Sequence, residues 1–130
     1  MTAMPSLTLS LQPETLAVCR LAPDAPLPGW AAGDFLSITR TPDELSIVWA
    51  ERDVPPSVQC ERGWRCLKVA GPLDLSLVGI RASLTVPLAE ARIALFAVST
   101  SDPDYLLVKE AEVGRAVEVL LREGHTMPLA

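Results

Sequence analysis

The sequence lacks most of the residues and motifs from which active sites are built. It contains one histidine, His125, so a serine or cysteine nucleophile has no evident general base elsewhere in the chain. Neither GxxxxGK(S/T) nor GxGxxG occurs, and the Cys, His and acidic residues show no metal-ligand spacing. We therefore expect no enzyme activity, no cofactor and no metal, and we interpret His125 as a residue at the end of a helix.

Positive charge is also scarce. The sequence contains eleven Lys and Arg and sixteen Asp and Glu, which gives a net charge of -5. The basic residues are scattered from Arg20 to Arg122 without a cluster. Nucleic acids and acidic membrane surfaces are bound by clustered basic residues. No apolar run is long enough to span a bilayer. We therefore expect neither nucleic acid nor a membrane as a partner.

Few cysteines are present, and their number is odd. Cys19, Cys60 and Cys66 have no metal-type spacing, and the N-terminal segment has no basic residue before its apolar stretch. A secretory signal would carry basic residues there. These features predict reduced, mostly buried thiols and a cytoplasmic protein.

Proline is abundant and unevenly placed, with eight of the twelve in residues 1–60. Because proline removes a backbone donor, this half is expected to form short strands and turns rather than long helices. Short apolar runs bounded by turn residues predict the strands. These runs are Leu7–Leu11, Thr15–Leu21, Phe35–Arg40, Leu45–Ala50, Trp64–Val69, Ile93–Ser99 and Tyr105–Lys109, with Thr126–Leu129 as a further candidate.

Two helices are predicted in the second half. The earlier one covers Ser76–Ala91, and Pro87 should kink it or shorten its last turn. The later one ends near Arg122, with Gly124 as the left-handed residue after its end. Its apolar stripe has helical spacing. The stripe comprises Val113, Ala116, Val117, Leu120 and Leu121.

The order of these elements indicates an α+β fold of the ferredoxin-like βαββαβ type. A second copy is indicated upstream, because residues 37–51 align without gaps on residues 96–110 across the same strand–turn–strand pattern. The first copy lacks an obvious helix. We therefore predict two tandem units, an N-terminal unit over 1–62 that is reduced in helix and a C-terminal domain over 63–130.

One stretch has the pattern of an anion site. Gly71–Ile80 leaves a strand through Gly-Pro, passes Asp74 and Ser76, and enters a helix whose free N–H groups favour a carboxylate. Gly79 weakens that helix by about 0.5–1 kcal/mol relative to Ala, so it implies close approach of a ligand or, equally, tight packing of helix on sheet. An amino acid would suit such a site.

Two further groups of residues have open interpretations. Asp102 and Asp104 flank a proline in a predicted turn, where they are either a solvated turn or a polar rim for a small ligand. Trp30, Trp49 and Trp64 either line a pocket or belong to the core.

The segment GWRCLKVAGPLDLSLVGIRASLTVPLAEARIALFAVSTSDPDYLLVKE resembles the ACT-domain family, and most of all its small bacterial tandem members. The likeness continues upstream through LAVCRLAPDAPLPGW and FLSITRTPDELSIV. It implies a ferredoxin-like fold and a regulatory role. It also implies an amino-acid or other small ligand at an interface between ACT units. Eukaryotic arginine sensors that are similar to this subgroup also use tandem ACT-like units.

The resemblance assigns the ligand to the loop from the first strand into the first helix and to the facing strand and turn. The loop residues are Gly71, Pro72, Leu73, Asp74, Leu75, Ser76, Leu77, Val78 and Gly79, and the facing residues are Ala97, Val98, Ser99, Thr100 and Ser101. Unlike many family members, this sequence carries no catalytic domain, and its first unit is missing helices.

Two hypotheses follow. The first is a non-enzymatic regulatory module that binds an amino acid between ACT units, assembles as a homo-oligomer and is read by a partner protein. The alternative is a ligand-free module for protein–protein interaction or oligomerisation through sheet edges or helix faces.

Overall fold

The computed structural model describes residues 6–29, 33–70, 79–100 and 104–128. The chain divides into two compact units. We call Pro13–Trp64 the inserted unit, and Met1–Gln12 together with Arg65–Ala130 the discontinuous unit. The sequence predicted units of 1–62 and 63–130, whereas the structure groups the first twelve residues with the C-terminal part of the chain.

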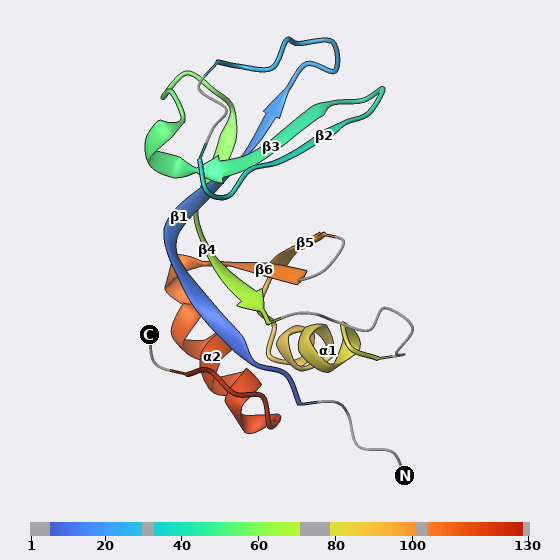
Figure 1. The fold of residues 1–130 in the computed structure, drawn as a ribbon, viewed down its shortest axis with the longest axis vertical. Helices are drawn as coiled ribbons and strands as arrows, with labels where there is room; N and C mark the ends of the chain where they lie inside the picture. Colours follow the sequence, from blue (N-terminus) through green and yellow to red (C-terminus); the bar gives the residue numbers. More distant parts are fainter. Residues whose placement is uncertain (1–5, 30–32, 71–78, 101–103, 129–130) are drawn as a thin grey trace. The chain divides into compact units, whose positions relative to one another are not determined.

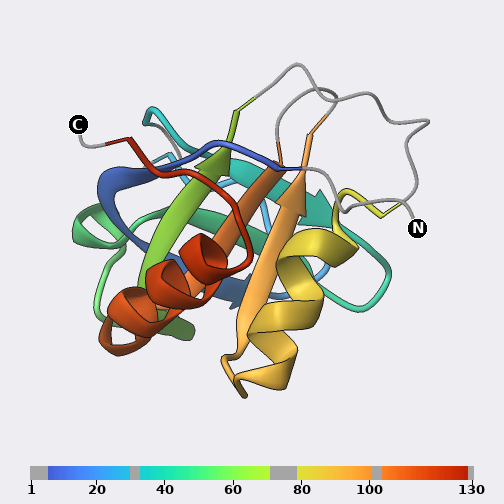
Figure 2. The same cartoon turned by 90° about the horizontal axis from the view of Figure 1, so that it is seen from below.

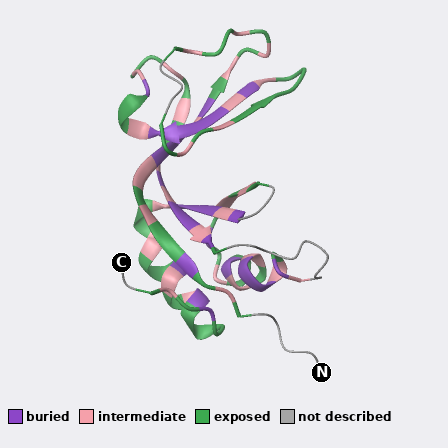
Figure 3. Ribbon diagram, in the orientation of Figure 1, coloured by how far each residue is buried: buried purple, intermediate pink, exposed green. Residues whose placement is uncertain are grey.

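The inserted unit is a small antiparallel sheet (Figure 1). Its strands are β2 (Ser37–Arg40), β3 (Leu45–Ala50), the second part of β1 (Leu9–Leu21) and the start of β4 (Cys60–Val69). β3 pairs with both β2 and β1 and is buried over most of its length (Figure 3). The core of this unit consists of Ala17, Cys19, Leu45, Ile47, Trp49 and Val54.

The discontinuous unit contains the described helices, α1 (Ala82–Glu90) and α2 (Val113–Arg122). Its sheet has the order β1-β4-β6-β5, where β5 is Leu95–Ser99 and β6 is Asp104–Lys109. Both helices cover one face of this sheet (Figure 2). The buried core of this unit contains residues of both the helices and the sheet, namely Leu9, Leu67, Val69, Leu84, Leu88, Ile93, Leu106, Val108, Ala116 and Leu120. The α+β, ferredoxin-like arrangement predicted from the sequence is therefore confirmed.

The last strand of that plan comes from an unexpected place. A strand was predicted at Thr126–Leu129, but the described part of this segment forms only an isolated parallel bridge between Thr126 and Thr8. The start of β1 occupies the outer position beside β4 instead, as shown by the hydrogen bond from the Ala70 N–H to the Thr8 carbonyl. Pro128 has no N–H with which to extend the bridge into a ladder.

β1 is one continuous strand of thirteen residues, where the sequence predicted two strands separated near Pro13. Pairing with β3 begins only at Leu16, so Pro13 costs that ladder no hydrogen bond. The strand can therefore run through the proline.

The internal repeat is present in the fold. β2 and β3 are followed by a 3-10 turn at Glu51–Asp53, and β5 and β6 are followed by one at Glu110–Glu112. The two hairpins have the same strand–turn–strand–turn order at the positions that the sequence alignment matched. The predicted duplication of the hairpin is thus confirmed at the level of secondary structure.

Helix α1 is shorter than the predicted Ser76–Ala91. Residues 76–78 lie outside the described part of the chain, and Gly79 has a left-handed φ of 89° that a continuing helix does not allow. The Gly79 carbonyl still accepts the Ser83 N–H at 2.9 Å, which is the hydrogen-bond spacing of an α-helix. Pro87 lies inside the helix, which continues to Glu90.

Helix α2 agrees with the prediction at its end and in part of its stripe. Gly124 has a φ of 95°, and the N–H groups of Gly124 and His125 close the helix on the carbonyls of Leu121 and Leu120. Ala116 and Leu120 are buried, but Leu121 is 48% exposed. Val119 packs against the core in its place, so the stripe is rotated slightly from the predicted one.

Among the described residues, no helix is both long and apolar enough to cross a membrane.

Candidate functional site

The candidate site lies at one end of the discontinuous unit. The C-terminal ends of β4 and β5 and the start of α1 meet there (Figure 2). Asp104 opens β6 at the same end, directly opposite Ser99 of β5 in the antiparallel register. Two segments that the resemblance assigned to the ligand also belong here by chain order, but Gly71–Val78 and Ser101 lie outside the described residues.

The described residues of the predicted site have different environments. Gly79 takes its left-handed conformation in the turn before α1. In the edge strand β5, Ala97 and Ser99 are exposed and Val98 is half-buried, and Thr100 after the strand is exposed. The structure therefore brings a glycine turn and a partly exposed strand end to the same end of the unit.

Asp104 is the residue of this region whose environment is most unusual. It is only 4% exposed, and its Oδ2 accepts a hydrogen bond from Arg81 Nε at 3.0 Å. Its Oδ1 is buried and has no hydrogen-bond partner among the described residues. The sequence offered a solvated turn or a polar rim for this aspartate, and the structure excludes the solvated turn. A buried carboxylate oxygen without a partner is costly and marks a position where a donor is expected.

Sequence reasoning did not single out Arg81, the other half of this pair. Arg81 is the N-cap residue of α1, and its side chain is 58% exposed. A cation at the positive end of a helix dipole is unfavourable unless another group compensates for it. The sequence did not show this placement, because the predicted helix began at Ser76, and in the structure Asp104 is the compensating group.

The environment of His125 indicates a structural role. It follows α2, is 3% exposed, and its Nδ1 accepts the Leu7 N–H at 3.1 Å. Its Nε2 lies 2.9 Å from the Ser83 carbonyl, so Nε2 carries the proton and donates. Both ring nitrogens are engaged with backbone, which leaves neither available as a general base.

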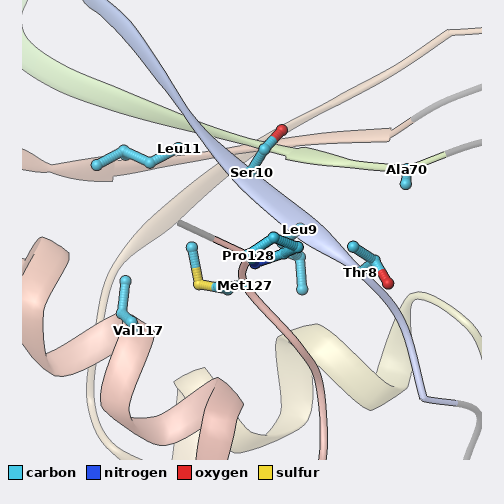
Figure 4. A pocket seen from close by; sticks show the side chains of 8 residues that line it. All are labelled: Thr8, Leu9, Ser10, Leu11, Ala70, Val117, Met127 and Pro128. Atoms are coloured by element: carbon cyan, nitrogen blue, oxygen red, sulfur yellow. The ribbon is translucent and has the colours of Figure 1, made fainter. Parts of the chain in front are cut away.

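A separate open cavity of about 520 Å³ lies beside the start of β1 (Figure 4). Leu9 and Leu11 line one side of it, and Val117 of α2 and Met127 line the other (Figure 4). No charged side chain is among its lining residues, so it offers no ionic partner to the ammonium or carboxylate of an amino acid.

The remaining candidate residues are part of the core or lack the features of a site. Trp49 and Trp64 are 0% and 6% exposed, which makes them core residues, and Trp30 lies outside the described residues. Within the described ranges, no group of His, Cys, Asp or Glu has an arrangement that could hold a metal.

Comparison with known proteins identifies the family. Residues 59–122 match the ACT domain, and residues 14–57 match a family described as an N-terminal domain. The crystal structure of an Agrobacterium tumefaciens protein, 37% identical, covers 97% of this chain and 95% of its own length with a TM-score of 0.92. The chain belongs to the ACT-domain family. The resemblance inferred from the sequence is therefore confirmed.

The curated relatives are amino-acid sensors. The bovine cytosolic arginine sensor for mTORC1 subunit 1 is 29% identical over 108 residues, which are 75% of this chain and 33% of the relative. The human protein of the same name is 40% identical over 60 residues, 45% of this chain and 18% of its own length. This chain therefore spans a third or less of the length of these relatives.

Regulatory subunits of aspartate kinase share the fold. The ligand-free subunit from Thermus thermophilus has a TM-score of 0.64 at 9% identity, over 89% of this chain and 97% of its own. At that level of identity the likeness concerns the fold alone.

Proposed function

We propose that this ACT-domain protein is a non-enzymatic regulatory module that binds a small ligand, an amino acid, at an interface between ACT units. The contact residues would be Gly71–Gly79 and Ala97–Ser101, joined by Asp104 and Arg81. Ligand binding would stabilise one arrangement of a homo-oligomer in the cytoplasm, and a partner protein would read that arrangement.

The observation that carries this proposal is the half-partnered carboxylate of Asp104. One oxygen is held by Arg81 and the other is buried without a partner among the described residues. An ammonium donor from a ligand would satisfy that oxygen with a charge-assisted hydrogen bond. The exposed guanidinium of Arg81 lies beside it and can attract a carboxylate. Adjacent groups of opposite charge match the two charges of an amino acid.

The surrounding backbone supports the same ligand class. Gly79 in its left-handed turn presents no side chain before α1, so a small molecule could approach the backbone closely there. β5 is an edge strand, so the outer side of its backbone pairs with no other described strand and offers polar groups to a ligand. Ala97 and Ser99 on this strand are exposed. The relationship to arginine sensors agrees with an amino-acid ligand.

The test is a thermal-shift screen of the purified protein against the twenty amino acids, followed by calorimetric titration of each hit. A ligand at one hundred times its dissociation constant should add about 2.7 kcal/mol of stability. Asp104→Asn should remove the response of the hit. Glu118→Gln, which alters an exposed carboxylate paired with Arg122, is the matched control and should keep it.

Either of two results would contradict the site. One is unchanged affinity in an Asp104→Asn protein whose circular dichroism matches the wild type. The other is a screen in which no amino acid raises the melting temperature of the wild type.

A ligand-free interaction module is the second candidate, and the edge strand β2 favours it. β2 ends the strand order, and Ile38, Thr39 and Arg40 on it are exposed. An apolar residue on an open edge is a site for pairing with another chain. Light scattering would then show an oligomer whose mass no amino acid changes, whereas a monomer at high concentration would exclude this function.

A further inference from the structure

The register of β1 and β4 places two cysteines of the inserted unit opposite each other. The Arg20 N–H donates to the Gln59 carbonyl at 3.0 Å. In an antiparallel pair, the neighbours of such a bonded pair face each other without hydrogen bonds between them. Those neighbours are Cys19 on β1 and Cys60 at the start of β4.

The side chains of these cysteines are in contact. The Cys60 side chain lies close enough to the Cys19 thiol to raise its pKa, and Cys60 packs against the core cluster that contains Cys19. A non-hydrogen-bonded pair has Cα atoms about 4.5 Å apart, which lies within the range that a disulfide spans. Both cysteines are in the reduced state in this structure.

We propose that Cys19 and Cys60 form a reversible thiol–disulfide pair that low-molecular-weight disulfides, such as glutathione disulfide, oxidise. The third cysteine, Cys66, does not take part. It lies six residues beyond Cys60 on β4, a distance of roughly 20 Å along an extended strand.

The reaction proceeds in two exchange steps. The Cys60 thiolate attacks one sulfur of the external disulfide, whose S–S bond breaks, and half of the reagent leaves as a thiolate that takes up a proton. The Cys19 thiol then loses its proton to solvent and attacks the Cys60 sulfur, the S–S bond of the mixed disulfide breaks, and the second half leaves as a thiolate that takes up a proton. The two cysteines lose two electrons in total, and the external disulfide is reduced to two thiols.

Burial determines the order of the steps. Cys60 is partly exposed and accessible to the reagent, whereas Cys19 is 1% exposed. Burial, with the neighbouring Cys60, raises the pKa of the Cys19 thiol to about 11, so it stays protonated while Cys60 reacts first. Burial raises the pKa of Cys66 to about 12, which keeps that thiol unreactive.

The experiment exposes the native protein to glutathione disulfide and measures intact mass, titratable thiols after denaturation, and disulfide-linked peptides. The wild type should lose about 2 Da, its free thiols should fall from three to one, and the linked peptide should join Cys19 to Cys60. Dithiothreitol should restore all three thiols. Cys66→Ala should lose the same mass as the wild type.

Single variants test the order of attack. Cys19→Ala should stop at the mixed disulfide and retain one glutathione, and Cys60→Ala should acquire none. Three free thiols in treated native wild type, a link that involves Cys66, or a disulfide between two chains would each overturn the proposal. The wild-type peptide map decides the pairing even if one variant fails to fold.

Discussion

Two residues occupy the same position after their helices, and only one of them is glycine. Gly124 follows α2 with a φ of 95°, and Arg92 follows α1 with a φ of 59°. Both helices end with the same pair of hydrogen bonds, which for α1 run from Arg92 to Ala89 and from Ile93 to Leu88. A left-handed conformation costs a residue with a Cβ about 1 kcal/mol or more. Arg92 therefore carries strain that Gly124 does not.

Arg92→Gly should raise the free energy of unfolding by about 0.5–1 kcal/mol, because glycine adopts the left-handed conformation without a Cβ clash. Urea denaturation of the variant and the wild type measures the difference. The matched control is Gly124→Ala, for which open space surrounds the new Cβ, so any loss comes from backbone conformation alone. A destabilised Arg92→Gly protein would contradict the assignment of strain.

The buried thiol of Cys66 makes stability depend on alkaline pH. Burial raises its pKa from 9.0 to about 12. Between these values the unfolded chain has lost the proton while the folded protein keeps it, so the free energy of unfolding falls as pH rises through this window. The full stabilisation is present below pH 9.

Measurement of urea midpoints between pH 9 and 11 tests this linkage. Deprotonation of Cys66 in the unfolded chain should lower the free energy of unfolding by up to about 1.4 kcal/mol per pH unit. Cys66→Ala should show a shallower decline than the wild type over the same range, although its stability is lower at neutral pH. Parallel declines in the two proteins would show that Cys66 is not the group responsible.

At the scale of elements, α1 is completed by a residue from the end of the chain. Pro87 has no N–H to donate to the Ser83 carbonyl one turn earlier. His125 Nε2 donates to that carbonyl instead, and His125 Nδ1 accepts the N–H of Leu7. A single imidazole, three residues beyond the end of α2, therefore connects the backbone of Leu7 to that of α1. The hydrogen bond from His125 thus satisfies the carbonyl that Pro87 leaves without a donor, and α1 continues past Pro87 to Glu90.

A double-mutant cycle on Pro87 and His125 tests this link. His125→Phe should cost about 2–3 kcal/mol, because it leaves the buried Ser83 carbonyl and Leu7 N–H without partners. In a Pro87→Ala background the restored N–H can satisfy Ser83, so the same change should cost about 1 kcal/mol less. Equal costs in the two backgrounds, measured by chemical denaturation, would show that the residues are not coupled.

Local patterns predicted strand β3 well and the start of α1 poorly. β3 was predicted with its observed bounds, because an apolar run between two turns needs no distant partner to be recognised. The start of α1 was placed too early, since apolar spacing alone does not reveal that Gly79 is left-handed. The same limit applied to α2, where the contact with the sheet selects Val119 over Leu121.

At the scale of the whole molecule, the repeat of the hairpins is visible in the sequence but the division into units is not. The long strands β1 and β4 each contribute residues to both units, so one unit is built from two separate stretches of chain and the other is inserted between them. A repeat of neighbouring residues can be found by alignment. The partner of a strand cannot be found that way when it lies more than fifty residues away, because hydrogen bonding between backbones carries no sequence signal.

The sequence by itself determined the α+β composition, the ACT-domain resemblance, the duplicated hairpin and the end of α2 at Gly124, because each depends on residues near one another in the chain. Tertiary structure alone decided that β1 fills the outer strand position beside β4 and that Arg81 pairs with Asp104. It also decided that His125 supports α1 and that Cys19 faces Cys60. These contacts join residues distant in sequence, and their burial is fixed only when the chain folds around them.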